Sequence, residues 1–405
     1  MYRVRTKIKI TQKTPYNGLV RNREMNLDFC VDFEISSTWE NMTSTAKITL
    51  PKNIGIVNKD GSVVNIQNRT GTDSNIGGLN SIPLFMRGDQ VVISAGYIYP
   101  DANRQENDNT KELYRGYITK VSSKKPFVLE CEDNMWLLKQ VPTPKKQWPR
   151  DYTLRQIVEE MIKDTSFTIS RKSEISVKYN IGTAMTNGES VASFLNDNNK
   201  NGFRFNARFI GNELRIGYPL YYAEEAVTHK FSFQQNIIED DLEYARKDDV
   251  AMSAVVQNYV IEQTGQKTKA GAMKTKKTRQ EVLVTYEFGK EKSYVKTKDR
   301  DFPPNEGGER RTFFYPNAGS TDEMIAFGFK QLKKYYYNGF TGTFTTFGIP
   351  WVKYGDFVEL KDDILPERNG LYVVRKVELS GGTSGLRQKI TLDFKINTGI
   401  QSELL

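Results

Sequence analysis

The stretches Ile82–Val91 (IPLFMRGDQV) and Ile349–Val358 (IPWVKYGDFV) align without a gap and share Ile, Pro, Gly, Asp and Val. In each stretch, proline breaks one strand, glycine permits a positive φ in a tight turn, and aspartate can bond its own backbone before the next strand begins. Two further strands keep the same order, with Leu113–Val121 and Phe127–Cys131 matched by Leu371–Val377 and Gln388–Phe394. A chance match of a common turn is the alternative. The agreement across several strands favours a duplication of antiparallel barrels or sandwiches.

Between the two copies the pattern changes to that of a small α+β unit. Prolines at positions 142, 144 and 149 break regular structure and indicate a domain boundary. Thr153 and Gln156 have the spacing of a capping box ahead of an apolar helical face, and a second helix is expected over Ser190–Asn199. A hairpin with its turn at Gly211-Asn212 follows. The sequence therefore predicts a mainly β fold with an α+β insert.

The duplication and the insert together predict three domains. The first β domain is expected over residues 1–141, the insert over 142–222, and the second β domain over 223–405 with a helix near 320–338. The alternating segment at the N-terminus predicts a strand with a basic, solvated face.

Three details of the first domain follow from the same alternation of residues. It places Phe29 on a buried face and Cys30 on the opposite face, whereas Cys131 is expected in the core. The polar residues 52–81 predict a long excursion, with a loose hairpin around Lys59-Asp60-Gly61.

A basic stretch, Gln266–Gln280 (QKTKAGAMKTKKTRQ), contains no acidic residue. It lies between predicted strands Ala251–Ile261 and Val282–Phe288, so we expect it in a hairpin loop. As a partner-binding surface it could meet an acidic protein surface or DNA, because phosphate binding needs charge but little sequence specificity. The alternative is a solvated loop. The candidate residues are Lys267, Lys269, Lys274, Lys276, Lys277 and Arg279.

The scarcity of histidine and cysteine restricts the possible chemistry. The 405 residues include one His and two Cys. A zinc site would need His229, Cys30 and Cys131 to converge, and a Ser-His-Asp or Cys-His nucleophile would have to use His229. The two cysteines are too far apart in sequence for thioredoxin-type or iron–sulfur chemistry. What remains is chemistry that uses carboxylates, Lys or Tyr, or no chemistry. We predict no catalytic residue, metal or cofactor, and assign His229 a structural role.

Charge and hydropathy give weaker indications. The net charge is +9, which is compatible with an anionic partner. No uninterrupted apolar region has the length of a signal peptide core or of a membrane helix. We therefore expect a protein made and kept in the cytosol, with reduced cysteines.

Much of the chain resembles the baseplate hub proteins of tailed phages. That family includes the hubs of contractile-tailed phages, the late-control tail proteins and the hub half of the type VI secretion spike. Glu189–Pro219 is similar to the family's insert, and Phe127–Met135 is similar to the end of its first barrel. The C-terminal matches are a capped helix followed by Gly342–Phe344, Gly348–Pro350, Gly355–Asp356 and Asn369–Val374.

The resemblance implies two β-barrel domains of similar fold and a homotrimer with six barrels around a channel. Such a ring joins a sixfold tail tube to a threefold central spike, and the duplication gives each chain two equivalent surfaces for two tube subunits. The implied partners are the tail tube protein, the spike protein and baseplate wedge proteins, with possible non-specific DNA contact in the channel. The implied location is the virion tail baseplate, assembled in the host cytoplasm. Because the sequence ends at Leu405, any cell-wall hydrolase is expected in a separate chain.

Two other classes of function stay open at this point. A carboxylate-dependent cell-wall hydrolase needs neither His nor Cys. A nucleic-acid-binding barrel could use the interleaved Arg and Phe of residues 203–209, although their strict alternation favours a packed core face. The acidic clusters that could serve a hydrolase are Glu130, Glu132 and Asp133; Glu239, Asp240 and Asp241; and Asp362 and Asp363.

Overall fold

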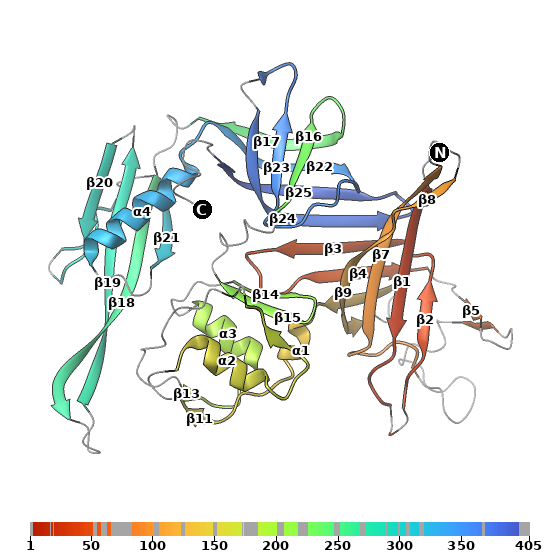
Figure 1. Cartoon of the computed structure of the whole chain (residues 1–405), viewed down its shortest axis with the longest axis horizontal. Helices are drawn as coiled ribbons and strands as arrows, with labels where there is room; N and C mark the ends of the chain where they lie inside the picture. The colour runs from red at the N-terminus through yellow and green to blue at the C-terminus, as the bar shows by residue number, and fades with distance from the viewer. Residues whose placement is uncertain are drawn as a thin grey trace.

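The computed structural model shows a mainly β protein with a few helices (Figure 1). The mainly β fold with an α+β unit, predicted from the sequence, is confirmed. The structure describes residues 3–16, 18, 20–51, 55–57, 63–65, 83–100, 105–122, 126–148, 152–171, 173, 185–200, 206–217, 226–246, 252–267, 273–287, 290–298, 300–304, 308–315, 320–366 and 369–396.

Fourteen of the described strands form one large sheet. Its N-terminal part is antiparallel throughout, and its apolar faces enclose a core that includes Phe33, Ile48 and Ile93. The strands in spatial order are β2 (Glu24–Leu27), β1 (Arg3–Thr11), β7 (Gln90–Pro100), β9 (Lys111–Val121), β10 (Phe127–Glu132), β4 (Thr45–Leu50) and β3 (Asp32–Thr38), with β8 (Glu106–Asp108) beside β7.

The C-terminal part of the chain continues the same sheet. β3 pairs antiparallel with β24, with Ile35 opposite Leu379, so the two halves share one hydrogen-bonded sheet. Closure of each half into a separate barrel stays a prediction. The strands of this half are β24 (Gly370–Gly382), β25 (Arg387–Ile396), β22 (Gly339–Phe347) and β17 (Ile237–Ala245), with β23 (Phe357–Lys361) beside β24 and β16 (Thr228–Ser232) beside β23.

The α+β unit has a core of its own, which includes Trp148, Ile157 and Leu195. Thr153 accepts a hydrogen bond from the Gln156 backbone and the Gln156 side chain accepts one from the Thr153 backbone, so the predicted capping box is confirmed. The elements are α1 (Met135–Leu138), β11 (Lys146–Gln147), α2 (Leu154–Ile162), β12 (Thr168–Ile169), β13 (Met185–Thr186), α3 (Val191–Lys200), β14 (Asn206–Ile210) and β15 (Glu213–Gly217).

A separate four-stranded sheet lies at the left of Figure 1, with helix α4 (Thr321–Tyr335) across it. The sequence analysis did not separate this layer from the C-terminal strands. Ser320 caps α4 by accepting the Glu323 backbone N–H at 3.2 Å. The strands in order are β20 (Lys290–Val295), β19 (Met273–Glu287), β18 (Met252–Lys267) and β21 (Glu309–Phe314).

The structure corrects the position of the basic stretch. It was expected in a hairpin loop, but Lys274, Lys276, Lys277 and Arg279 lie within β19, and Lys267 is the last residue of β18. The hairpin itself is present, with Tyr259 opposite Arg279. The β-branched Thr275 and Thr278 favour a strand, and ladder hydrogen bonds join backbone groups whatever the side-chain charge. Lys269 lies outside the described residues.

The prediction of which side chain is buried, Phe29 or Cys30, just before β3, is also wrong. Phe29 is 55% exposed, whereas Cys30 is 1% exposed and belongs to the core. The strand begins only at Asp32, so the alternation of residues does not extend back to Phe29. Cys131 is buried as expected. β5 (Gly55–Val57) pairs antiparallel with β6 (Val63–Asn65), and the predicted turn at Lys59-Asp60-Gly61 lies outside the described residues.

Candidate functional site

The first repeated turn is organised by a buried aspartate. Asp89 is fully buried, and its carboxylate accepts the backbone N–H of Met86 at 2.8 Å while its own N–H bonds to the Met86 carbonyl at 3.1 Å. Gly88, at φ +92°, donates to the carbonyl of Ile118, and the Ile118 N–H returns a bond to the Asp89 carbonyl. The turn is thereby tied to the neighbouring strand β9.

The second turn repeats these hydrogen bonds position by position. Asp356 accepts the Lys353 N–H at 2.9 Å and donates to the Lys353 carbonyl at 3.1 Å. Gly355, at φ +87°, donates to the carbonyl of Val374, and the Val374 N–H bonds to the Asp356 carbonyl. The sequence repeat is therefore also a structural repeat at the level of single hydrogen bonds.

The two carboxylates have different side-chain partners. Arg21 binds Asp89 through two nitrogens, at 2.9 and 2.8 Å, and both side chains are fully buried. His229 Nε2 lies 3.0 Å from the Asp356 carboxylate, and these side chains are 10% and 11% exposed. The only histidine of the chain thus occupies the place that arginine has in the first turn.

The flanking strands reach the two turns from different directions. Asp89 also accepts the backbone N–H of Lys13, just after β1, which runs antiparallel to β7. Asp356 accepts the N–H of Val227, just before β16, which runs parallel to β23. The same carboxylate acceptor therefore holds a neighbouring chain segment in both halves, although the strand direction has changed.

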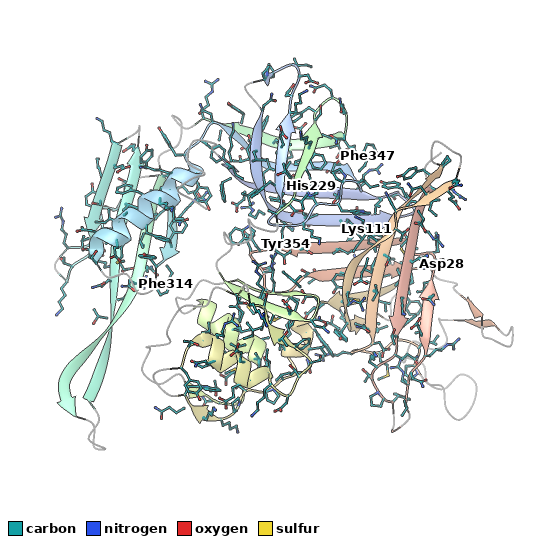
Figure 2. The ribbon with its side chains drawn as sticks, viewed as in Figure 1. Asp28, Lys111, His229, Phe314, Phe347 and Tyr354 are labelled. Carbon is teal, nitrogen blue, oxygen red and sulfur yellow. The ribbon has the colours of Figure 1, made fainter. Side chains whose placement is uncertain are left out.

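A cavity of about 620 Å³ lies where the two halves and the insert meet. Lys111 and Arg115 line it from β9, Arg208 from β14, and Tyr354 from the second turn. Figure 2 labels Lys111 and Tyr354 in this central region. The guanidinium carbon of Arg208 lies 4.7 Å from the Tyr354 ring centroid, and Asn134 Nδ2 donates to the Gly211 carbonyl at 2.7 Å. These contacts fix the insert between the halves.

Burial changes the ionisation of two groups in the wall of this cavity. It raises the pKa of Asp133 to about 6, although the backbone N–H groups of Ser44 and Met135 oppose the shift by donating to the carboxylate. Burial also raises the pKa of the Tyr354 phenol, while Arg208 opposes that shift. The wall contains both cations and carboxylates, so it selects no ligand charge.

The predicted partner-binding residues that the structure describes lie along the β18–β19 hairpin. Arg279 is exposed, and its guanidinium pairs with Glu281 at 2.6 Å. The backbone places Lys274, Lys276 and Lys277 on the same strand. The structure therefore brings most of the basic candidates onto one element, away from the cavity.

The acidic clusters are engaged in structural contacts or lie on a strand edge. Glu130 pairs with Lys120 and Glu132 with Lys139. Asp362 is 5% exposed and accepts the backbone N–H groups of two residues that follow it, and Asp363 pairs with Lys361. The remaining cluster is the exposed part of strand β17, Glu239, Asp240 and Asp241.

The sequence reasoning missed Arg21 and the interaction of Arg208 with Tyr354. Arg21 stands in a segment without periodicity, so no local pattern indicates its burial. The repeated Gly-Asp did indicate the turn, but only the fold shows which cation reaches each aspartate. Among the described residues, no group of three or more His, Cys, Asp or Glu side chains could hold a metal ion, and no helix has the length and apolarity to cross a membrane.

Comparisons with known proteins give a likeness of fold. No family model matches the chain, and no curated protein matches it. The 43 kDa tail protein of prophage MuSo2 from Shewanella oneidensis is 11% identical with a TM-score of 0.50, over 96% of this chain and 98% of that chain. The tail protein from Neisseria meningitidis MC58 is 11% identical with a TM-score of 0.51, over 97% of each chain. The chain therefore has, along almost its whole length, the fold of solved tail proteins.

Proposed function

We propose that this protein is a structural hub of the tail baseplate of a tailed phage or a related injection system. The observation that carries the proposal is the fold shared with two tail proteins over 96% and 97% of the chain. Fold alone does not determine function, so the proposal also uses the internal repeat. The two Asp turns give the two halves the same hydrogen-bonded anchor, as expected of a chain that presents two equivalent surfaces.

In this proposal the chain forms a homotrimer that joins the sixfold tail tube to the threefold central spike. Three copies with two related halves each provide six quasi-equivalent positions. The tube protein, the spike protein and the wedge proteins are the proposed partners, and the location is the virion tail after assembly in the host cytoplasm. The basic β18–β19 hairpin is the proposed partner-binding surface. Non-specific DNA contact in the channel is its other proposed role.

The proposed protein is not an enzyme. The acidic side chains that a hydrolase would need, Glu130, Glu132, Asp362 and Asp363, are paired or bonded to backbone. These contacts support a structural role for the first and third clusters. The alternative, a carboxylate-dependent cell-wall hydrolase, is tested by substituting all three acidic clusters by Ala and assaying cell-wall hydrolysis. A wild-type hydrolase activity that the substitutions abolish would establish the hydrolase.

The hub proposal is tested by stoichiometry. The purified chain, alone and with its candidate spike protein, is weighed by mass photometry and imaged by negative-stain electron microscopy. The expected species has three times the mass of the 46.5 kDa chain and forms a threefold ring with a central opening. A monomer in both samples would contradict the proposal.

A further inference from the structure

The β18–β19 hairpin extends beyond the sheet to which it belongs. β21 pairs with β18 only from Met252 to Gln257, and β20 pairs with β19 only from Val282 to Glu287. Beyond these points, Tyr259–Lys267 and Met273–Arg279 pair with each other, and no other described strand pairs with them. We call these two segments the β18–β19 arm. Nine residues of strand span roughly 30 Å, and Figure 1 shows the arm projecting away from the rest of the molecule.

The arm offers an unpaired strand edge to which a strand of a partner can add. Val256 and Val282, at its base, pack in a hydrophobic cluster under α4. A two-stranded hairpin on its own is marginally stable in water, and an unpaired strand edge offers N–H and C=O groups to another chain. The outer edge of β19 along Met273–Arg279 is such an edge within the described part of the protein.

The charge of the arm restricts which strand can add to it. The arm contains five basic residues, Lys267, Lys274, Lys276, Lys277 and Arg279, and one acidic residue, Glu262, which lies opposite Lys276. Lysines on an edge oppose pairing between two identical edges, because like charges would face each other. The edge of β19 is therefore matched to an acidic strand.

The chain itself contains an acidic strand with a free edge. Among the described strands, β17 pairs only with β22. Leu242 and Tyr244 pack against the core and hold the strand in register. Its exposed carboxylates form no ion pair with the described residues, and they are Glu239, Asp240, Asp241 and Glu243.

We propose that the arm of one copy adds along β17 of a second copy, with the edge of β19 beside the edge of β17. Figure 1 shows β17 and the arm far apart in one chain, so the pairing has to join different copies. A basic edge at one place and an acidic edge at another make a head-to-tail contact, which closes into a ring when the rotation between copies allows it. The inference rests on the proposed hub function and identifies the contact that holds its ring.

Charge reversal with rescue tests the contact. The variant K274E/K276E/K277E and the variant E239K/D241K/E243K are each expected to weaken trimer formation at least about tenfold, measured by mass photometry at about 50 mM salt. In an equimolar mixture of the two variants, both kinds of interface between unlike copies are attracting, but a ring of three must place two like copies side by side and keeps at least one repelling interface. The combined six-residue variant restores opposite charges at every interface. The combined variant is expected to recover the wild-type assembly.

A matched control reverses three exposed lysines elsewhere, as K7E/K13E/K389E, and is expected to assemble like the wild type. If a β17 variant fails to fold, disulfide trapping replaces it. A mixture of Thr275→Cys and Asp241→Cys chains is expected to form cross-linked dimers, whereas Thr275→Cys mixed with Lys389→Cys is not. The native cysteines, Cys30 and Cys131, are buried and do not interfere.

The outcomes separate this inference from the proposed function. A wild-type trimer that is unaffected by either reversal, and that gives no cross-link, would overturn the arm contact and leave the hub proposal intact. A trimer that persists while a reversal abolishes binding of the tube protein would also overturn it, since the arm would then serve another partner. A wild-type chain that stays monomeric with its spike protein would contradict the hub proposal itself.

Discussion

At the scale of single residues, two buried carboxylates organise the molecule. Asp89 and Asp356 each accept the N–H of the residue three positions earlier and each hold a second chain segment. Their partners differ, since Arg21 makes a two-point contact and His229 a single one. A carboxylate removed from water is tolerable only when it is paired and hydrogen-bonded. The stability of each turn therefore depends on the side chain that pairs with its aspartate.

Removal of the two partners is expected to have unequal effects. Arg21→Ala leaves a fully buried carboxylate without its cation and is expected to lower the free energy of unfolding by about 3–5 kcal/mol. His229→Ala removes one hydrogen bond and is expected to cost about 1–3 kcal/mol. Urea denaturation measures both, with Lys13→Ala as an exposed control. Equal costs for the two variants would contradict this account of the turns.

Asp133 is expected to make stability depend on pH. Its pKa rises from 3.8 to about 6 on folding, so the folded chain binds this proton more tightly than the unfolded chain. Ionisation of Asp133 therefore destabilises the fold. The contribution of Asp133 to the free energy of unfolding falls by up to about 3 kcal/mol as the pH rises from about 4 to about 6, and stays level above that. Asp133→Asn is expected to flatten this part of the profile in urea denaturation at several pH values. Parallel wild-type and variant profiles would show that Asp133 is not responsible.

At the scale of elements, close approach of helix and sheet explains the layer that carries the arm. A Cβ atom on Gly328 would lie 2.6 Å from Val284 Cγ2 and 2.9 Å from Val256 Cγ2. Glycine therefore lets α4 lie directly on β18 and β19, at the base of the arm. The helical period of α4 indicates its apolar face, but it does not show that the opposing surface leaves no room for a methyl group.

Enlarging Gly328 is expected to separate this helix from its sheet. Gly328→Val inserts three carbons into a filled contact and is expected to cost about 1–3 kcal/mol, with faster hydrogen exchange in α4 and in the base of β18. Ala326→Val, on the exposed side of the same helix, carries the β-branched penalty without the clash. Similar exchange rates in the two variants would argue against the tight contact.

At the scale of the whole molecule, the two halves share one sheet and part of one core. Leu379 and Leu386, from the C-terminal half, belong to the hydrophobic core of the N-terminal half. Tyr97 links the halves again, because its hydroxyl donates to the Leu386 carbonyl and accepts the Gly348 N–H. The duplicated units are therefore joined as one body rather than connected by a linker.

Disruption of this junction is expected to affect both halves together. A Cβ on Gly381 would lie 2.5 Å from the Phe33 ring, so Gly381→Leu forces β24 away from β3. Hydrogen exchange is expected to accelerate in both strands. Ser384→Leu, in the exposed turn nearby, is the control. Exchange that rises on one side of the junction only would contradict a shared core.

Local sequence patterns predict the mainly β fold, the capped helices, the repeated Gly-Asp turn and the basic character of the hairpin. Those features depend on residues close in sequence, whose periodicity and turn chemistry act locally. Three other features follow from the folded arrangement. Arg21 and His229 hold the two aspartates, Cys30 is buried while Phe29 is exposed, and the basic residues form part of a projecting strand. These depend on which strands meet across long separations, as β3 and β24 do, and no local pattern encodes that pairing.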